Sequence, residues 1–384
     1  MASLEKLRQP SKRSKIEAAV QAVQGDPTVK AEKKKPTAIA QLTEIRDKLL
    51  RLKIIFVELD NEDDAYIIFE TLNTRGKDLE APDLLKNFII KNVASKNKDV
   101  NVAKEKWQQI QEQFVETDAD IDLKGFLYHY WLSKYGFVAN RRLFKEIKRT
   151  IAKNKVPEFL EDLTSAADVY RLIHETDFGD WEKPELPLRA SLDALQTFRV
   201  RLQVPMVLAT IELYRGDQIN LSMAVEVLRA IENFHFTFTA LTSQRSSGGI
   251  SSMYSSAARS LWEARDRNER GRVIREFVKK LRDRAPDEPE FKIGFNDLKF
   301  SSKYTKQRQL VRYVLEGIHR YENPDAGLDY SKMTIEHLAS ERPKGGQQLS
   351  AESVASLGNL LLVPEDVNSA LKNKSFLEKK QILT

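Results

Sequence analysis

Apolar residues recur at steps of three and four along most of this chain, which is the repeat of an α-helix with one buried face. The first clear case starts at Ala38, and its apolar stripe consists of Ile39, Leu42, Ile45, Leu49 and Leu52. We expect this stripe to be buried. The β-branched run over residues 53–59 predicts a short strand. A helix that ends near Gly76 follows, and another begins at Pro82.

The middle of the chain, from about residue 100 to 330, keeps the helical period almost throughout and contains no convincing series of strands. Residues Phe126–Leu132 are dense in aromatic side chains, and such a stretch usually belongs to a helix that faces the core. We therefore expect residues 101–304 to form a helical middle region.

The C-terminal residues 305–384 combine short strands with short helices. Thr334–Leu338 predicts one strand, and Asn359–Val363 predicts another before a lysine-rich final helix. Between them, Ser350 is the expected cap of a helix that stops at Gly358. The chain is thus expected to be mainly α, with helical N-terminal and middle regions and a small C-terminal α+β module.

Composition narrows the class of protein. Of the 384 residues, 41% are hydrophobic and 31% are charged, which indicates a soluble globular chain. There is no cysteine, so disulfides, thiolate nucleophiles and cysteine-ligated metal sites are excluded, and a reducing cytoplasm fits. No apolar run approaches the ~20 residues that span a bilayer, so we expect no membrane partner. Residues 1–36 hold few large apolar side chains and predict a basic tail or a loose helix, separate from residues 37–100.

The formal net charge of +6 is concentrated in one segment, because ten basic and five acidic residues lie between Arg259 and Arg284. Four of the basic side chains follow helical steps on one face: Arg272, Arg275, Lys279 and Arg282. The opposite face is apolar and predicts core contacts. Such a charged face is either simply solvated or binds the DNA backbone in a salt-dependent way, and the sequence does not decide between the two.

Histidine is the most informative chemical residue here, because the chain has only five. His129 and His235 lie among aromatic residues and predict core or interface positions, while His174 and His319 have no clustered partner in the sequence. His337 differs, because Glu336 precedes it and Asn359 and Asn368 follow in the same small module.

These residues carry a family resemblance, which covers about residues 305–384. The segments that carry it are Ile335-Glu336-His337-Leu338, Gly358–Leu362, Asn368, Asn373–Phe376 and Lys379-Lys380. They resemble the C-terminal HNH-type (His-Me finger) nuclease domain of the GmrSD family of modification-dependent restriction enzymes. That resemblance implies a ββα-metal module, in which a β-hairpin and a helix hold one divalent metal.

The resemblance also implies a role for each residue. His337 corresponds to the general base, a task that suits an imidazole with its ordinary pKa of ~6.5. Asn359 corresponds to the residue that braces the loop carrying the base, and Glu336 and Asn368 to the metal ligands. Because Glu336 and His337 point to opposite faces of a strand, one site can use both only at a bend or a strand end.

Other interpretations of these side chains stay open. Asn359 beside Gly358 is also suited to a turn, and Asn368 to a helix cap. Oxygen ligands of this kind favour Mg²⁺ or Mn²⁺ over Zn²⁺. Lys374 and Lys379 are candidate contacts to a DNA phosphate.

A second match lies upstream. Phe69, Asn73 and Gly76 resemble the second motif of the family's N-terminal nucleotide-handling domain, so they are candidate nucleotide contacts. Equally, they fit a core phenylalanine and an asparagine near a helix end. Residues 37–100 thus resemble only the second half of that domain, because the family's Asp-Gly-Gln-Gln-Arg motif is absent before Ala38. NTP hydrolysis by this chain alone is therefore not expected.

Two further departures from the family are visible. Ser340 stands where relatives usually have proline, and relatives continue beyond residue 384 with another helix. We therefore expect a fragment, a split gene or a domain-degraded homologue.

The resulting hypothesis is a cytoplasmic, metal-dependent, HNH-type DNA endonuclease of the GmrSD restriction class that acts against foreign or phage DNA. The alternative is a catalytically inactive DNA-binding or regulatory remnant, which acts with a separate chain that supplies the missing nucleotide-handling half. Whether the chain forms a homo-oligomer is left open by the sequence.

Overall fold

The computed structural model describes residues 38–52, 80–93, 97–243, 248–323, 328–342 and 349–383. The chain divides into two units, Met1–Gly76 and Lys77–Thr384. In the first unit the described part is one helix, α2 (Ala38–Leu50), as the sequence predicts. Its apolar stripe is exposed, with Ile39, Leu42, Ile45, Leu49 and Leu52 all more than half accessible, so the expectation of a buried face is wrong for the described residues.

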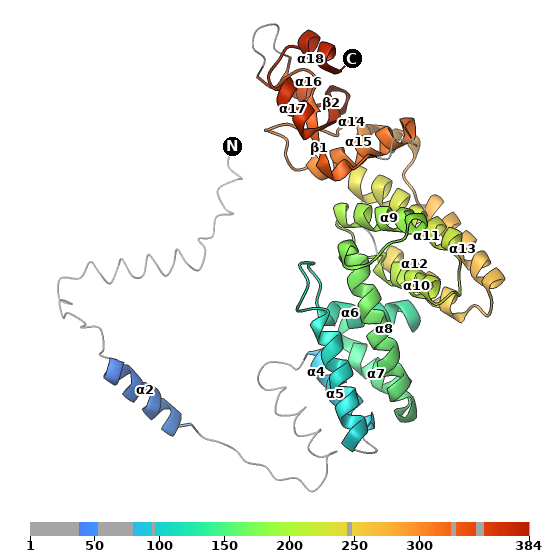
Figure 1. Cartoon of the computed structure of the whole chain (residues 1–384). Helices are drawn as coiled ribbons and strands as arrows, with labels where there is room; N and C mark the ends of the chain where they lie inside the picture. The colour runs from blue at the N-terminus through green and yellow to red at the C-terminus, as the bar shows by residue number, and fades with distance from the viewer. Residues whose placement is uncertain are drawn as a thin grey trace, which may run out of the picture. The chain divides into compact units, whose positions relative to one another are not determined.

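The second unit begins with an array of packed helices, drawn from cyan to orange in Figure 1. These helices are α4 (Ala81–Val93), α5 (Asn97–Glu112), α6 (Leu123–Lys134), α7 (Leu143–Thr150), α8 (Val156–His174), α9 (Leu186–Thr197), α10 (Val204–Arg215), α11 (Leu221–His235), α12 (Gly248–Glu263) and α13 (Arg267–Arg282). Helix α8 packs against the earlier helices α4, α5 and α6 and also against the later helices α9 and α10. It therefore connects the first helices of the array to those that follow it. One continuous apolar core fills the space between these helices.

Local sequence signals explain where these helices begin and end. Asp122, Asn220 and Asp266 each occupy an N-cap position, where the side chain accepts a hydrogen bond from a first-turn backbone N–H. In α6 the aromatic stretch is buried as predicted, with Phe126, Tyr130 and others facing the core. Short 3-10 turns separate several helices: Asn140–Arg142, Lys153–Lys155, Thr176–Phe178, Lys183–Glu185, Tyr330–Lys332 and Leu357–Asn359.

The C-terminal module lies beyond α13 and contains the small sheet (Figure 1). Its elements are α14 (Glu288–Asn296), α15 (Arg308–Glu322), β1 (Met333–His337), α16 (Ala351–Ala355), β2 (Leu360–Pro364), α17 (Glu365–Leu371) and α18 (Phe376–Leu383). Strands β1 and β2 are antiparallel, with Met333 opposite Pro364 and His337 opposite Leu360. Helix α17 follows β2 directly and packs on both strands.

The module has its own apolar core, built from α15 and the inward residues of both strands. This core reaches the helical array through Leu241, the last residue of a π-helix over Phe236–Leu241 that continues α11. Gly294 in α14 lies so close to that turn that an added Cβ would be 2.8 Å from the Leu241 carbonyl oxygen. Only glycine allows this approach without a shift of backbone.

The structure confirms the expectation of a mainly helical chain with a small sheet. Both C-terminal strands are where the sequence predicts them, to within one residue, and Ser350 caps α16. The predicted strand over residues 53–59 and the helix that ends near Gly76 lie outside the described residues.

Candidate functional site

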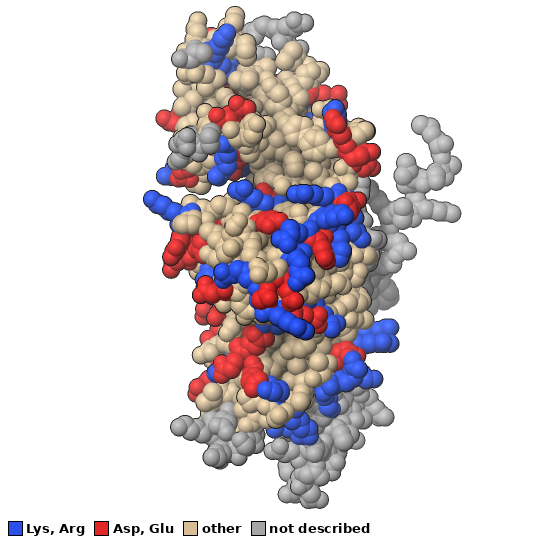
Figure 2. All heavy atoms as spheres, turned by 90° about the vertical axis from the view of Figure 1, so that its right-hand side faces the viewer, with Lys and Arg blue, Asp and Glu red and all other residues tan. Residues whose placement is uncertain are grey.

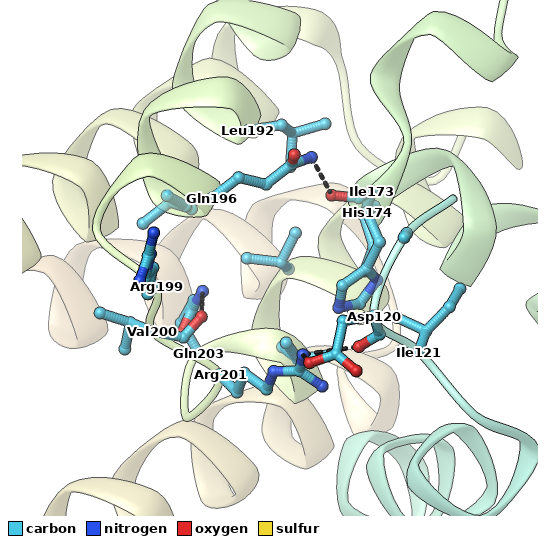
Figure 3. Close-up of a pocket in the computed structure, with 14 residues that line it drawn as sticks. Asp120, Ile121, Ile173, His174, Leu192, Gln196, Arg199, Val200, Arg201 and Gln203 are labelled. Carbon is cyan, nitrogen blue, oxygen red and sulfur yellow. Dashed lines mark hydrogen bonds and ion pairs between the residues drawn. The ribbon is translucent and has the colours of Figure 1, made fainter. Parts of the chain in front are cut away.

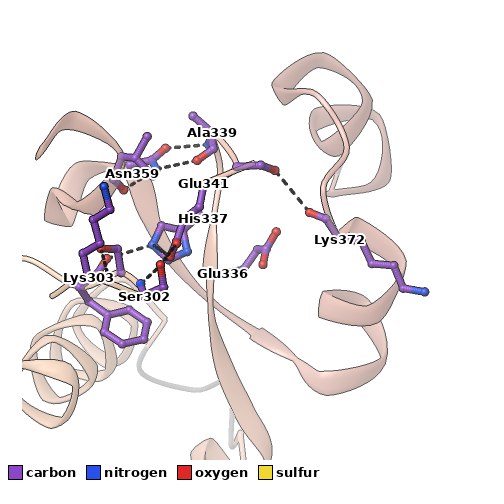
Figure 4. Close-up of polar contacts among 12 residues, drawn as sticks. Ser302, Lys303, Glu336, His337, Ala339, Glu341, Asn359 and Lys372 are labelled. Atoms are coloured by element: carbon purple, nitrogen blue, oxygen red, sulfur yellow. Dashed lines mark hydrogen bonds and ion pairs between the residues drawn. The ribbon is translucent and has the colours of Figure 1, made fainter. Parts of the chain in front are cut away.

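The candidate site lies where β1 ends. His337 is the last residue of β1, and Asn359 immediately precedes its partner strand β2. The Asn359 Oδ1 accepts a hydrogen bond from the Ala339 backbone N–H at 2.7 Å, and its Nδ2 donates to the carbonyls of Ala339 and Val354. Both contacts with Ala339 are visible in Figure 4. One amide thus joins the segment after His337 to the turn before β2.

The His337 ring has a defined orientation. Its Nε2 lies 2.9 Å from the carbonyl oxygen of Phe300, and a carbonyl only accepts hydrogen bonds, so Nε2 carries the proton. The ring also stacks on the Phe300 side chain, with centroids 5.8 Å apart. In the neutral imidazole this leaves the lone pair on Nδ1. The contact with Phe300 therefore selects the tautomer whose Nδ1 can accept a proton.

Glu341 lies beside the same ring nitrogen of His337, Nε2. Its Oε1 is 3.6 Å from His337 Nε2 and accepts a hydrogen bond from the Ser302 backbone N–H at 2.8 Å, while the Ser302 hydroxyl donates to Oε2. Burial raises the pKa of the Glu341 carboxyl, but the Ser302 hydrogen bonds and the charges of His337 and Arg342 outweigh it, so the net pKa is lowered. A carboxylate is therefore maintained beside the proton-bearing nitrogen.

Glu336 points to the other side of β1 (Figure 4). The residue is 8% exposed, and its carboxylate is paired with Lys379 of α18, whose Nζ donates to Oε1 at 2.5 Å. The same ammonium donates to the His337 carbonyl at 2.6 Å. Lys379 is buried and lines the pocket at this strand end, where its ammonium is engaged by Glu336 and the His337 carbonyl.

Asn368 does not join Glu336 and His337. It lies on α17, and its Nδ2 donates to the Thr334 hydroxyl at 2.6 Å, two residues along β1 from Glu336. Among the described residues no three His, Cys, Asp or Glu side chains cluster to hold a metal ion. In this state the residues that the sequence nominates as ligands do not fit a divalent cation, because Lys379 engages one and Thr334 engages the other.

A pocket of about 310 Å³ opens at this strand end, and both Glu336 and His337 line it. It also contains residues that the sequence interpretation missed, namely Ser302, Ser340, Glu341, Arg342, Lys372 and Asn373. Arg342 is exposed and carries a positive charge at the pocket, whereas the Lys372 side chain points away from His337 (Figure 4). Glu341 is four residues after His337, but that spacing is too common to have identified it. Ser302 lies on a distant segment.

The basic face predicted on α13 is present. Arg272, Arg275, Lys279 and Arg282 are exposed, and Ile274, Phe277, Val278 and Leu281 on the other side of the helix are buried. Figure 2 shows many basic side chains across the middle of the molecule, interleaved with acidic ones. Lys374 is exposed near the C-terminus, while Phe69, Asn73 and Gly76 lie outside the described residues.

The helical array contains a second polar centre. His129 Nδ1 pairs with the Tyr170 hydroxyl, and His174 Nδ1 donates to the Tyr170 carbonyl at 2.8 Å. Burial lowers the pKa of His129 to about 3 and that of His174 to about 4, so both rings are neutral near neutral pH. The expectation that His129 belongs to the core agrees with this packing, whereas the sequence missed the contact of His174 with the same tyrosine.

A cavity of about 500 Å³ adjoins His174 (Figure 3). Arg201 at its edge donates to the Asp120 carboxylate at 2.7 Å, and Gln196 reaches the Ile173 carbonyl at 3.4 Å. Most of its polar side chains are thus bonded to the protein, and Leu192, Leu195 and Val207 make much of the wall apolar.

Two family models match the chain, and neither match includes the residues that line this cavity. The model of the GmrSD restriction endonuclease C-terminal domain matches residues 286–384, and the model of the GmrSD restriction endonuclease N-terminal domain matches residues 3–90. None of the curated proteins matches the chain significantly. Among the helices in the described ranges, none has both the length and the apolar character needed to cross a membrane.

Proposed function

Because the chain belongs to the GmrSD restriction endonuclease family, we propose that its C-terminal module is an HNH-type DNA endonuclease acting against foreign or phage DNA. The observation that carries this proposal is the orientation of His337. Its Nε2–H donates to the Phe300 carbonyl, so the lone pair of Nδ1 remains for a proton. A base held in one tautomer beside an open pocket is what activation of a water molecule requires.

The proton balance is simple. A water molecule transfers a proton to His337 Nδ1 as its oxygen attacks the phosphorus atom, and the ring becomes an imidazolium. The bond from phosphorus to the leaving sugar oxygen breaks with its electron pair on that oxygen, which takes a proton from solvent water. The imidazolium then releases its extra proton to solvent, which restores the neutral base. The Phe300 carbonyl and the Glu341 carboxylate lie at the opposite nitrogen and stabilise that positive charge. Asn359 keeps the segment after His337 fixed through its three hydrogen bonds, so the ring does not need to reorganise during the reaction.

Mg²⁺ or Mn²⁺ is the proposed cofactor, with Glu336 and Asn368 as its ligands. Such a cation, when bound, would polarise the scissile phosphate and neutralise charge on the leaving oxygen. Neither side chain is free in the described state, since Lys379 pairs with one and Thr334 with the other. We therefore assign the cation no catalytic step in this state.

DNA is the proposed substrate, and exposed basic side chains support contacts with its backbone. The α13 face offers Arg272, Arg275, Lys279 and Arg282 to the phosphates, Arg342 lines the pocket itself, and Lys374 is exposed in the C-terminal module. Phe69, Asn73 and Gly76 remain a proposed nucleotide contact, and a separate chain remains the proposed source of the motif this sequence lacks.

Plasmid nicking in Mg²⁺ or Mn²⁺ tests the proposal directly. His337→Ala is expected to lower the rate by roughly 10²- to 10⁴-fold, the usual contribution of a general base. His319→Ala is the matched control, because His319 lies in the same module but bonds to the Tyr330 hydroxyl away from the pocket. Equal nicking by the parent and His337→Ala would refute the nuclease assignment.

The closed state of Glu336 favours one alternative, a catalytically inactive DNA-binding or regulatory remnant. In that case the α13 face would bind DNA while the pocket does no chemistry. Salt-sensitive DNA binding that is unchanged in His337→Ala, together with no detectable Mn²⁺ binding by the parent or by any variant that frees Glu336, is the result that would support it.

A further inference from the structure

A dense group of positive charges lies around α7, outside the residues that either family model matches. Residues 140–155 hold one acidic side chain, Glu146, and seven basic ones: Arg141, Arg142, Lys145, Lys148, Arg149, Lys153 and Lys155. All seven are exposed. We call these seven basic residues the α7 patch. Its charge is less balanced by acids than that of Arg259–Arg284, where five acidic residues lie among ten basic ones.

The protein itself neutralises little of this charge. The ion pairs formed by the patch are Arg149 with Glu146 at 2.6 Å and Lys155 with Glu158 at 2.9 Å. Four members form no ion pair with any residue that the structure describes: Arg141, Arg142, Lys145 and Lys153. Leu143 and Ile147 bury the opposite face of α7 in the core, so the helix is held with its basic face outward. Like charges held this close attract a polyanion.

An aromatic ring lies in solvent next to the patch. Helix α6 ends before Gly136, whose φ of +102° turns the chain, and the side chain of the next residue, Phe137, is 63% exposed. The loop is anchored on either side of that ring, because Val138 is buried and its carbonyl accepts a hydrogen bond from the Tyr128 hydroxyl at 3.1 Å. Phe137 is therefore held outside the core by its own fixed backbone.

A pocket of about 640 Å³ connects this ring to the basic side chains. Phe137 lines it together with three arginines, Arg142, Arg149 and Arg259, and the stacked rings of Trp131 and Tyr135 form part of its wall. Each of its two acidic residues is paired with one of the arginines, Glu146 with Arg149 and Glu263 with Arg259. The pocket thus presents a free guanidinium, from Arg142, beside an exposed aromatic face.

We propose that the α7 patch and this pocket bind single-stranded DNA, with phosphates on the basic side chains and one base stacked on Phe137. The proposal rests on the proposed function in naming DNA as the nucleic acid. Positive charge beside an exposed ring suits an unpaired strand, because each nucleotide carries a phosphate and each base has a face that can stack. In a duplex the bases are already stacked on one another, so the ring contributes nothing to duplex binding.

The first experiment measures binding of a fluorescent oligothymidylate to the full chain by anisotropy, in EDTA so that no divalent cation supports cleavage. Phe137→Ala is expected to weaken binding by roughly 5- to 150-fold, the range for loss of one base stack, and to leave the affinity for covalently closed plasmid unchanged. The ring is mostly exposed, so its removal costs little packing. Tyr321→Ala removes another exposed ring, on α15, and is the matched control that should bind like the parent.

The second experiment measures how the affinity for the same oligonucleotide depends on salt. Arg142→Gln combined with Lys145→Gln removes two phosphate contacts, so the slope of log K against log salt should become shallower by about 1.4. Lys183→Gln combined with Arg229→Gln is the matched control. These two residues are exposed, line a different cavity and form no ion pair within the described residues, so the parental slope is expected.

Two results would overturn the proposal. One is an oligonucleotide affinity that is the same in Phe137→Ala and the parent. The other is a parental salt slope in the variant that lacks the charges of Arg142 and Lys145. If that variant instead loses binding to vesicles of phosphatidylserine and phosphatidylcholine while it binds the oligonucleotide like the parent, the α7 patch contacts a membrane surface and the DNA assignment is wrong.

The outcomes separate the α7 patch from the nuclease assignment. If His337→Ala abolishes nicking but the α7 variants bind the oligonucleotide like the parent, the patch proposal is wrong and the nuclease proposal stands. If Phe137→Ala loses single-strand binding but His337→Ala nicks like the parent, the patch proposal stands and the nuclease assignment is wrong.

Discussion

Lys134 and Lys379 each pair with a carboxylate and have little exposed surface, and they are held in different ways. Lys134 at the end of α6 contacts Asp162 at 2.5 Å and Glu212 at 3.1 Å, and its ammonium lies 4.2 Å from the centre of the Trp262 ring. Lys379 contacts one carboxylate and one carbonyl. The Lys134 side chain is 10% exposed and that of Lys379 is 1% exposed, and the helices around them differ in packing.

The difference lies in the helices that carry them. Most of the α6 residues around Lys134 are buried in the main core, including Tyr130, whose hydroxyl donates to Asp162. On α18 no other residue is buried. A buried ionic contact on a well-packed helix is thus part of the fold, whereas the same contact on an otherwise exposed helix can be released without unfolding the core.

Removing the charge of each lysine is expected to give the largest difference in stability between the two regions. Lys134→Met leaves the buried Glu212 and the partly exposed Asp162 without their cation, and we expect it to lower the free energy of unfolding by about 3 kcal/mol. For Lys379→Met we expect a smaller loss, because α18 buries no other side chain and Glu336 regains water once this helix undocks. Urea denaturation in EDTA measures both. Equal losses would mean that α18 is as firmly fixed as α6.

The sequence predicts the parts of this comparison that depend on local pattern. Helical period gives α6 and its aromatic core face, short apolar runs give β1 and β2, and the Ser350 cap gives α16. His337 and Asn359 are nominated from the sequence through the short motifs that carry the family resemblance. Each of these features depends on residues close together along the chain.

The contacts that the sequence does not predict join distant segments. Lys379 and Glu336 are 43 residues apart, and the Phe300 carbonyl is 37 residues from His337. Such contacts depend on how helices and strands pack against one another. The spacing of apolar residues along the sequence does not specify that packing. The exposed stripe of α2 has the same cause, since its period predicts a helix but does not name what covers it.

The next largest expected effect is the pH dependence of stability that Glu212 causes. Burial raises its pKa from an ordinary 4.5 to about 7, which the Lys134 charge only partly offsets. A raised folded-state pKa means that the contribution to stability is complete below about pH 4.5 and is lost as pH rises through about 7. Glu212→Gln does not titrate, so its stability relative to the parent is expected to rise by on the order of 1–3 kcal/mol between pH 5 and pH 8.

Denaturation at those two pH values, with the exposed Glu226→Gln as control, measures the difference. A variant whose stability relative to the parent stays constant with pH would show that Lys134 keeps Glu212 ionised throughout.

Asn359 tests how far polar contacts, rather than packing, hold the C-terminal module. Asn359→Ala removes three hydrogen bonds to backbone groups and is expected to cost about 1–2 kcal/mol of unfolding free energy. Asn359→Asp keeps the acceptor for the Ala339 N–H but turns a carboxylate oxygen toward the Ala339 and Val354 carbonyls, and should be at least as destabilised as the alanine variant. If both variants unfold like the parent in urea, the amide does not brace the segment after His337.

Glu341 gives the smallest effect and the opposite sign of pH dependence from Glu212. Burial raises its pKa, but the Ser302 hydrogen bonds and the nearby charges of His337 and Arg342 lower it further, so the net pKa lies below the ordinary 4.5. Its contribution is therefore present above pH 4.5 and is lost as pH falls through the lowered value.

The Glu341→Gln variant should therefore be less stable than the parent at pH 6. The loss should be less than about 1 kcal/mol, since the carboxylate is partly exposed. That deficit should shrink in acid, as pH falls through the lowered pKa and the parent carboxyl also becomes neutral. Denaturation curves at pH 6 and in acid thus set the two regions against each other: the core carboxyl loses stability as pH rises, and the pocket carboxyl loses it as pH falls. A deficit that persists in acid would mean that the substituted amide is destabilising through its shape, and that Glu341 does not act through its charge.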